Sequence, residues 1–392
     1  MKTTSLIPSL LALLLAAIFV TSCQTDDTDF SQYTYEGSET SGDDDSDDAT
    51  IVSDDTISIA WNGSSVTVTG DERDCITTSG ADVIVNDTST TIALTLVLSG
   101  STTDGSLLVY RQKKYTMLLN GVDITNLDGP AINNQCGKSL YVICADGTTN
   151  TLTDGTSYAT QTYQQKGTLF SEGQIYFSGE GTLNVSGNHD NAIACDDYIT
   201  VSSGITINTM TSASGTNGIK ANDGMFINGG TLSIDVASDG GRGINCDART
   251  VISGGDITIN TSGDCLIETI NGVQDTTSAA GIKSDSLFTM TAGTMTITST
   301  GDGGKGIRCN ENVEISGGTL VVRTTGSNNI GKPKAIKSDT GIIISGGSLT
   351  ATVKKSWALD NGTDSETPAD RITVKGTPAT ASIEKKSVVV TF

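Results

Sequence analysis

Histidine is nearly absent from this 392-residue sequence, and its scarcity limits the catalytic chemistry available. The single histidine, His189, lies in a polar loop sequence, and we interpret it as an exposed loop residue rather than an acid–base group. The eight cysteines include no C-x-x-C spacing of the kind found in zinc sites. Ser-His or Cys-His triads and zinc-dependent catalysis therefore have little support.

Aromatic residues and cations are also few. Aromatic side chains make up 5% of the sequence and form no recognisable flat platform of the kind that binds crystalline cellulose. Tyr158, Tyr163 and Tyr198 are the candidates for stacking on a sugar ring, whereas Trp61 and Trp357 are interpreted as packing residues. Lys and Arg number 23 against 45 Asp and Glu, a net charge of −22, which argues against nucleic acid and anionic lipid as partners.

No segment after the N-terminal apolar run keeps the apolar spacing of three and four that predicts a helix. Short segments with apolar residues at alternate positions occur instead, separated by Gly-Gly pairs. One unit recurs: Gly or Ala, an isoleucine, a small residue two positions later, then Asp or Asn, a Gly-Gly turn and a further strand. Its anchor isoleucines, separated by 26, 25, 38, 25 and 29 residues, are Ile193, Ile219, Ile244, Ile282, Ile307 and Ile336.

A repeat of this length that carries strands and glycine turns is typical of a solenoid. We therefore predict an all-β fold, a parallel β-helix, as a single elongated domain over residues 56–392, with neighbouring coils about 4.8 Å apart. Residues 56–70 are expected to cover its N-terminal end, and residues 370–374 and 387–392 its C-terminal end, because an open sheet edge would pair with other molecules.

The position two residues after each anchor is small, and we expect it to point inward beside the isoleucines. Cysteines two coils apart in this column would lie roughly 10 Å from each other, beyond the reach of a disulfide, so we interpret them as packed thiols. The pairing of Cys75, Cys136, Cys144 and Cys265 is left open. The column contains Cys195, Ala221, Cys246, Ser284, Cys309 and Ser338.

Residues 1–22 resemble a bacterial lipoprotein signal peptide, because Lys2 precedes an apolar run of about fifteen residues, short for a membrane span. Cys23 follows directly and is predicted to be lipidated; an ordinary signal peptide with an incidental cysteine is the alternative. Residues 24–55 contain twelve acids and no Lys or Arg, which predicts that 23–55 form an extended acidic stalk. These features predict an outer membrane lipoprotein exposed at the cell surface.

Several longer strings carry a family resemblance: IAWNGSSVTVTG at 59–70, LLNGVDI at 118–124, ADGTTNTLTDG at 145–155 and GEGTLNVSG at 179–187. Together with the repeat, they resemble the carbohydrate-binding β-helix family of bacterial cell-surface proteins. The resemblance implies a right-handed parallel β-helix, related in fold to calcium-dependent pectate lyases, that binds calcium and acidic polysaccharide such as polygalacturonate without cleaving it.

Calcium ligands are sought among acids close to the repeat. Three residues after each anchor, an outward column of Asp and Asn offers the hard oxygen ligands that calcium prefers, and acids at the preceding corners would complete the shells. Many relatives carry an acid beside the anchor where this chain reads DGGRGI at 239–244 and DGGKGI at 302–307, so a cation stands there. Ion pairs with adjacent lysines, or turn capping, are the alternatives. The predicted ligands are Asp239, Asp247, Asp264, Asp285, Asp302 and Asp339.

Cations adjoin this acidic column and are the candidates for binding carboxylates of an acidic glycan, with solvated surface charge as the alternative. They are Lys220, Arg242, Lys283, Lys305, Arg308 and Lys337. The sequence thus predicts a monomeric, non-catalytic protein that binds an acidic polysaccharide with the help of calcium. A calcium-dependent lyase of the pectate type and an inert surface adhesin are the alternative functions.

Overall fold

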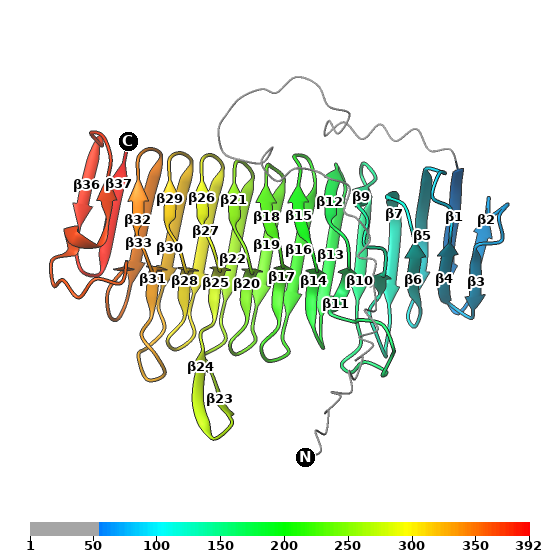
Figure 1. Ribbon diagram of the computed structural model, residues 1–392, viewed down its shortest axis with the longest axis horizontal. Helices are drawn as coiled ribbons and strands as arrows, with labels where there is room; N and C mark the ends of the chain where they lie inside the picture. The colour runs from blue at the N-terminus through cyan, green and yellow to red at the C-terminus, as the bar shows by residue number, and fades with distance from the viewer. Residues whose placement is uncertain (1–54) are drawn as a thin grey trace, which may run out of the picture.

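The computed structural model describes residues 55–392, so the predicted signal peptide, Cys23 and nearly all of the stalk at 23–55 lie outside the described residues. Within the described range the chain forms strands, turns and one 3-10 helix, η2 (Pro368–Arg371). No helix there is long and apolar enough to cross a membrane. The strands stack coil upon coil along one axis, from β1 at one end to β33 and β37 at the other (Figure 1). The predicted all-β parallel β-helix is confirmed.

A regular coil contributes one strand to each of three faces. Face 1 is a twelve-stranded sheet of β3 (Ile76–Ser79), β4 (Asp82–Asp87), β6 (Ser106–Arg111), β8 (Ile132–Asn134), β11 (Gly167–Ser171), β14 (Asn191–Cys195), β17 (Asn217–Ala221), β20 (Arg242–Cys246), β25 (Ala280–Ser284), β28 (Lys305–Cys309), β31 (Lys334–Ser338) and β34 (Leu359–Asp360). Face 2 consists of β9 (Leu140–Cys144), β12 (Ile175–Gly179), β15 (Tyr198–Val201), β18 (Gly224–Ile227), β21 (Thr250–Ile252), β26 (Phe288–Met290), β29 (Val313–Ile315), β32 (Ile342–Ile344) and β35 (Thr373–Val374). Face 3 consists of β10 (Thr149–Thr153), β13 (Thr182–Gly187), β16 (Thr206–Thr211), β19 (Thr231–Val236), β22 (Asp256–Thr261), β27 (Thr294–Ser299), β30 (Thr319–Thr324) and β33 (Ser348–Val353).

Three longer strands at the N-terminal end merge faces 2 and 3 into one sheet. They are β1 (Asp55–Asn62), β5 (Leu94–Thr102) and β7 (Tyr115–Thr125). The first part of β7 pairs with β9 on face 2 and its last part pairs with β10 on face 3. The two faces therefore separate only after β7, where the regular three-strand coils begin.

The anchor isoleucines lie in one column on face 1, as the repeat predicts. Ile193 pairs with Ile219, and the register continues through Ile244, Ile282, Ile307 and Ile336. The column extends beyond the recognised repeats, to Val83, Leu107, Ile132 and Leu169 on one side and Leu359 on the other. All of these side chains are buried in one continuous apolar core. Hydrophobic burial along this shared core is the main favourable term in folding.

The glycine before four of the anchors is required by close packing inside the coil. A Cβ at Gly218 would lie 2.5 Å from the side chain of Ile234 on face 3, and one at Gly306 would lie 2.0 Å from Val322. Gly243 and Gly281 meet the same obstacle from the isoleucines of β22 and β27. The Gly-Ile pair of the repeat is thus a corner where faces 3 and 1 approach too closely for a side chain.

The small column beside the anchors is buried, and most of its members also satisfy a backbone carbonyl. Cys195 Sγ donates to Gly173 O at 3.2 Å, and Ser284 Oγ donates to Ala248 O at 2.8 Å. The seven cysteines within the described range are buried and free, in agreement with the interpretation as packed thiols. Burial raises the pKa of the Cys246 and Cys309 thiols to about 11, so neither is a thiolate near neutral pH.

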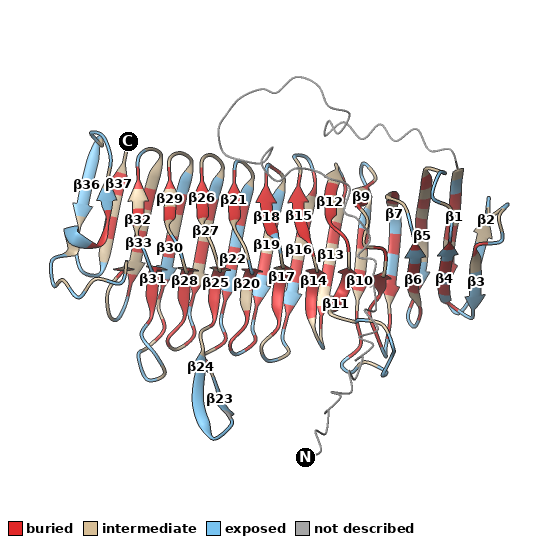
Figure 2. Ribbon diagram, viewed as in Figure 1, coloured by how far each residue is buried: buried red, intermediate tan, exposed pale blue. Residues whose placement is uncertain are grey.

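Antiparallel strands close both ends of the solenoid. At the N-terminal end β2 (Val66–Thr69) pairs antiparallel with β1, and β3 pairs antiparallel with β4. At the C-terminal end β37 (Ser387–Thr391) pairs antiparallel with β33, and β36 (Thr380–Ile383) covers β37. Exposed residues concentrate in these end strands, whereas the central coils are mostly buried or intermediate (Figure 2). The predicted end segments therefore do cover the sheet edges.

One hairpin interrupts the regular coils. The strands β23 (Leu266–Ile270) and β24 (Val273–Thr277) pair only with each other and project away from the solenoid (Figure 1). They lie between β22 and β25, so they account for the spacing of 38 residues between Ile244 and Ile282. The coil after the hairpin returns to the same register as the coil before it.

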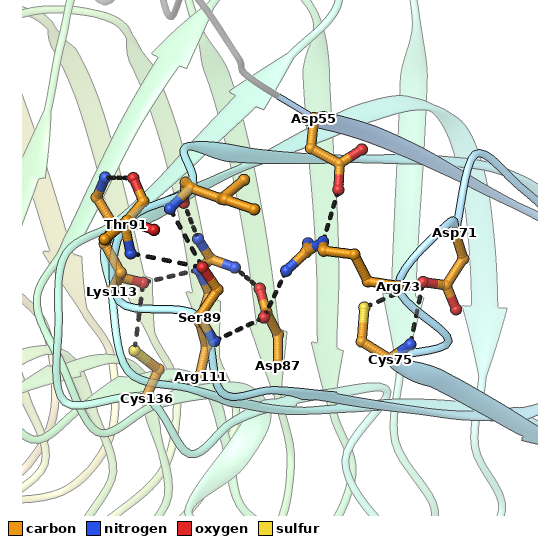
Figure 3. Close-up of polar contacts among 11 residues, drawn as sticks. Asp55, Asp71, Arg73, Cys75, Asp87, Ser89, Thr91, Arg111, Lys113 and Cys136 are labelled. Carbon is orange, nitrogen blue, oxygen red and sulfur yellow. Dashed lines mark hydrogen bonds and ion pairs between the residues drawn. The ribbon is translucent and has the colours of Figure 1, made fainter.

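A polar network lies beneath the N-terminal end (Figure 3). Arg73 contacts Asp55 at 2.9 Å and Asp87 at 2.6 Å, and Arg111 forms a further ion pair with Asp87. The side chains of Asp87 and Arg111 are 2% and 0% exposed. Arg111 also donates to the backbone oxygens of Ile92 and Lys113. Both buried charges are therefore neutralised within the protein.

Candidate functional site

The six predicted cations all lie on face 1. Lys220, Lys283, Arg308 and Lys337 occupy a single outward column, with Asn245 between the first two. Arg242 and Lys305 belong to a neighbouring column at the start of their strands, and this second column ends in Lys334. We call the six cations the cationic strip: Lys220, Arg242, Lys283, Lys305, Arg308 and Lys337.

Three lysines of the cationic strip are paired with the aspartates of the adjacent column. Lys283 lies 2.7 Å from Asp285 and Lys337 lies 3.1 Å from Asp339. Lys220 pairs with Asp247, on the next coil rather than its own. The alternative interpretation as surface ion pairs therefore describes these three lysines.

The other three cations of the strip have no carboxylate partner among the described residues. Lys305 is 7% exposed and donates only to a backbone oxygen, that of Gly303 at 2.5 Å. Burial and the neighbouring charge of Arg308 lower the pKa of Lys305 to about 8. Burial and Arg308 also lower the pKa of Arg242. Arg242, Lys305 and Arg308 are thus partly desolvated and form no ion pair with the described residues, although the charges of Asp285 and Asp247 favour the charged form of Arg242.

Two polar atoms beside these cations lack a hydrogen-bond partner within residues 55–392. They are Nε of Arg308 and Oδ1 of Asn245. Asn245 is separated from Arg308 by one coil in the outward column. Buried polar atoms are almost always hydrogen-bonded in folded proteins, so an unpaired donor and acceptor on one surface indicate a place for a ligand or for water.

The Asp and Asn column that was predicted to bind calcium is largely neutralised by other side chains. Asn310 Nδ2 donates to Asp285 at 2.8 Å, and Asn222 Nδ2 donates to Asp196 at 3.2 Å. Lys166, which the prediction did not include, contacts Asp196 at 2.6 Å. Amide and ammonium donors thus occupy oxygens that a cation would need.

The corner aspartates Asp239, Asp264 and Asp302 do not join that column. They stack where face 3 turns into face 1, and each accepts a backbone N–H from the next coil: Asp264 N at 2.8 Å, Asp302 N at 2.7 Å and Ser327 N at 2.9 Å. These hydrogen bonds join neighbouring coils, so they differ from turn capping, in which an aspartate bonds the backbone of its own turn. In the part of the chain that the structure describes, no three acidic, histidine or cysteine side chains converge as a metal site.

An acidic group beside face 1 was missing from the prediction. Burial and the nearby Asp223 raise the pKa of Asp197 to about 6, and burial and Asp196 raise the pKa of Glu172. The anchor sequence gives Asp196 directly, but Asp197 and Asp223 follow it at the corner toward face 2. An alignment of whole coils, instead of the anchor motif alone, would have put Asp197 and Asp223 at equivalent positions of neighbouring coils and predicted that they lie close together.

Face 2 carries a column of four aromatic side chains. Tyr141 and Tyr176 are neighbours in register and stack with centroids 5.0 Å apart. Tyr198 meets Tyr176 and Phe226 edge to face, at 5.7 Å and 6.0 Å. The prediction missed this column because it compared repeats only around the face 1 anchor. Tyr198 and Phe226 are buried and the contacts of Tyr198 are edge to face, so the column forms no flat platform, in agreement with the expectation.

His189 lies in an exposed loop, as interpreted from its sequence. Its Nδ1 is 3.2 Å from Thr156 O, and its ring lies 4.5 Å from that of Tyr158. Tyr158 donates to Asp154, which also accepts the backbone N–H groups of Asn188 and His189. These contacts hold two loops together and include no nucleophile beside the imidazole.

The fold and the charged strip define a parallel β-helix protein with a cationic surface on one face. A family model described as "Carbohydrate-binding domain-containing protein" matches residues 80–247 and 237–329, more than half of the 392 residues. The chain therefore belongs to this carbohydrate-binding family.

Two similar proteins can be named, one for its sequence and one for its fold. A "Carbohydrate-binding domain-containing protein" of Acetivibrio thermocellus is 30% identical over 111 residues, which is 27% of this chain and 39% of that relative. The chain thus matches well under two thirds of the relative's length. A solved structure described as a polysaccharide lyase-like protein from C. thermocellum, a gadolinium derivative, has a TM-score of 0.53 and 22% identity. It covers 66% of this chain and 96% of its own, which shows the shared fold.

Proposed function

We propose that this protein binds an acidic polysaccharide on the cationic strip of face 1 and does not cleave it. Membership of a carbohydrate-binding family supports the ligand class. The single observation that carries the acidic specificity is the group Arg242, Lys305 and Arg308, which has no carboxylate partner among the described residues. A uronate carboxylate placed there would accept charge-assisted hydrogen bonds, the strongest kind available to these donors.

The periodicity of face 1 suits a polymer better than a small molecule. Neighbouring coils present their side chains about 4.8 Å apart, so the strip repeats a weak contact along the solenoid axis. Of the three paired lysines, Lys220 and Lys337 continue the strip on either side of the unpaired cations, and Lys283 lies on the coil between Arg242 and Lys305. Each lysine alone contributes little to affinity. Several such contacts to one polysaccharide chain increase the affinity, because the first contact raises the effective concentration of the glycan at the others.

Calcium assistance remains a prediction for this protein. The predicted aspartates lie in two separate columns and already accept hydrogen bonds or ion pairs, so a bound cation would have to take further ligands from the glycan. Polygalacturonate affinity measured with calcium and again with a chelator tests this: loss of affinity without calcium supports it, and equal affinity contradicts it.

Lyase activity is the alternative, and the lowered pKa of Lys305 is the observation in its favour. A lysine with a pKa of about 8 is suitable as a base near neutral pH. Lys305 is 7% exposed, however, and its ammonium group is bonded to Gly303 O, so it does not face an open cleft. Incubation with polygalacturonate and measurement of ultraviolet absorbance separates the two functions, because β-elimination yields unsaturated uronates that absorb.

The main test is calorimetric titration with oligogalacturonate. Replacing both arginines in the variant Arg242→Gln/Arg308→Gln should weaken binding by about a hundredfold, because hydrogen bonds to charged groups contribute about 1.5–3 kcal/mol each. The matched control Lys354→Gln/Lys355→Gln removes the same charge from an exposed turn and should leave affinity unchanged. Equal losses in both variants would mean that only net charge matters.

The cellular location is part of the proposal. Cys23 and the acidic stalk lie outside the described residues, and lipidation at Cys23 remains a prediction. Mass spectrometry of the membrane fraction should find acylated Cys23, and the variant Cys23→Ala should move the protein out of that fraction. Protease accessibility on intact cells tests surface exposure, and analytical ultracentrifugation tests the predicted monomer.

A further inference from the structure

The outward column of face 1 changes character toward the N-terminus. In the coils of β4, β6 and β8 the positions in register with the lysines are Ile84, Leu108 and Asn133. Ile84 is 40% exposed, whereas the anchor isoleucines of the same face are almost fully buried. This apolar surface is the floor of a cavity of about 250 Å³.

Two segments outside the regular coils form the walls of this cavity. The connection 154–166 between β10 and β11 contributes Tyr163 and Gln165, and the turn after β7 contributes Asn126 and Asp128. We call the whole site the N-terminal groove: Asp82, Ile84, Leu108, Asp128, Asn133 and Tyr163.

Hydrogen bonds fix the walls to each other and to the floor. Asn133 Nδ2 donates to Gln164 O at 2.9 Å, which ties the long connection to face 1. Ala159 N donates to Asp128 O at 2.7 Å, which ties it to the opposite wall. The Tyr163 ring packs edge to face on Tyr110, with centroids 6.4 Å apart. The groove is therefore formed before any ligand arrives, which lowers the entropic cost of binding.

The charge of the N-terminal groove is opposite to that of the cationic strip. Asp82 and Asp128 line it, and no Lys, Arg or His is among its described lining residues. Ser106 Oγ donates to Asp82 at 2.7 Å, whereas the carboxylate of Asp128 has no hydrogen bond or ion pair within residues 55–392. A ligand carboxylate would be repelled here, and hydroxyl or ammonium donors would be attracted.

We propose that the N-terminal groove is a second glycan site, which binds a sugar residue without a carboxylate and prefers an amino sugar to a neutral one. The apolar face of the pyranose ring packs on Ile84, Leu108 and Tyr163. Its amino and hydroxyl groups donate to Asp82 and Asp128. The cavity of about 250 Å³ is slightly smaller than the range of about 300–1,000 Å³ typical of ligand pockets, so it suits one or two sugar rings of a longer chain.

The experiment titrates the full-length protein with three hexasaccharides: glucosamine hexamer, cellohexaose and galacturonate hexamer. We expect glucosamine hexamer to bind more tightly than cellohexaose. The variant Asp128→Asn should weaken glucosamine hexamer by about tenfold, since one charge-assisted hydrogen bond is lost, and should reduce its advantage over cellohexaose. The matched control Asp146→Asn removes an exposed charge outside the groove and should change neither affinity.

A second pair of variants tests the ring contact without relying on charge. Tyr163→Ala should abolish binding of both glucosamine hexamer and cellohexaose. Tyr163→Phe keeps the aromatic ring and should still bind both. Absence of binding by glucosamine hexamer and cellohexaose, or binding that none of the groove variants alters, would overturn the proposal.

Galacturonate hexamer distinguishes this site from the cationic strip. Its affinity should be unchanged by Asp128→Asn and Tyr163→Phe, and should fall with Arg242→Gln/Arg308→Gln. Suppose that Arg242→Gln/Arg308→Gln leaves galacturonate binding intact while Asp128→Asn and Tyr163→Ala still weaken the binding of glucosamine hexamer. The acidic-glycan proposal then fails and the groove proposal stands.

Discussion

Two buried cations of face 1, Arg111 and Lys305, differ in what they contact. At the N-terminal end Arg111 is fully buried and meets Asp87, which also pairs with Arg73 (Figure 3). At the C-terminal end Lys305 is almost as buried but contacts only a backbone oxygen. A buried charge without a partner is destabilising, whereas a buried and hydrogen-bonded pair is tolerated. Arg111 is therefore neutralised within the protein, as is Lys334, which pairs with Asp360 at 2.9 Å one coil beyond Lys305, whereas Lys305 itself has no carboxylate partner among the described residues.

The surface side chains of face 1 also differ between these two regions. Along one face the side chains change from apolar and acidic at Ile84 and Asp82 to cationic at Arg308 and Lys337. The regular backbone is the same in both regions, and only the residues at equivalent positions differ. A solenoid can therefore place two sites of opposite specificity on one face, at coils far enough apart to act independently.

The largest effect should come from breaking the structural end. Asp87→Ala leaves Arg111 buried without a counter-ion, so the free energy of unfolding should fall by about 3–5 kcal/mol. Urea denaturation measures this loss, and hydrogen exchange should show it concentrated in β4 and β6, because solenoid stability depends on neighbouring coils. Asp146→Asn, an exposed position, serves as control. A loss below about 1 kcal/mol would show that the network is not needed for stability.

The opposite result is expected at the cationic end. Lys305 has a folded-state pKa of about 8 against an ordinary value of 10.5, so Lys305→Met should raise the free energy of unfolding at pH 7 by up to about 3 kcal/mol. The same variant should bind galacturonate more weakly, because a cation of the strip is gone. Lys354→Met at an exposed turn is the control, and stabilisation of both variants alike would contradict a specific cost at Lys305.

The pH dependence of Lys305 follows from linkage. Below pH 8 both the folded and the unfolded protein carry the proton, and the destabilising buried charge is fully present. Between pH 8 and 10.5 the folded protein loses this proton first, so the unfolded chain binds more protons and the free energy of unfolding rises with pH. This rise should be missing in Lys305→Met. Galacturonate affinity of the unmodified protein should fall over the same range, since a neutral amine no longer attracts a carboxylate.

The fold was predictable because its repeat fixes the register. Once Ile219 and Ile244 lie one coil apart, the residues beside them must form columns as well, and Lys283 and Arg308 had to be neighbours. The pairing of these side chains was not predictable to the same degree. Lys220 reaches Asp247 on the next coil, whereas Lys283 pairs with Asp285 on its own, and only side-chain conformations decide between the two.

The features that the sequence did not reveal depart from the repeat. The N-terminal groove depends on the connection 154–166, which has no counterpart in the regular coils, and its tyrosine could be named as a stacking candidate but not placed. The aromatic column of face 2 is periodic, but its members Tyr141, Tyr176 and Phe226 lie in coils where the anchor motif is weak or absent, or far from the anchor. The prediction was therefore limited for two reasons: the connection 154–166 does not follow the repeat, and the repeats were compared only around the anchor of face 1.

The smallest effect should be found where the cationic strip is already neutralised. Lys283 and Asp285 form a partly exposed pair at 2.7 Å, and such pairs contribute about 0–1 kcal/mol. In a double-mutant cycle, Lys283→Gln and Asp285→Asn should show a coupling of less than about 1 kcal/mol. The double variant has the same net charge as the unmodified protein, so it should keep galacturonate affinity within about threefold, which is less than 1 kcal/mol. A loss as large as that of Arg242→Gln/Arg308→Gln would mean that glycan binding displaces Asp285 from Lys283, and the distinction between paired and unpaired cations would no longer explain the specificity of face 1.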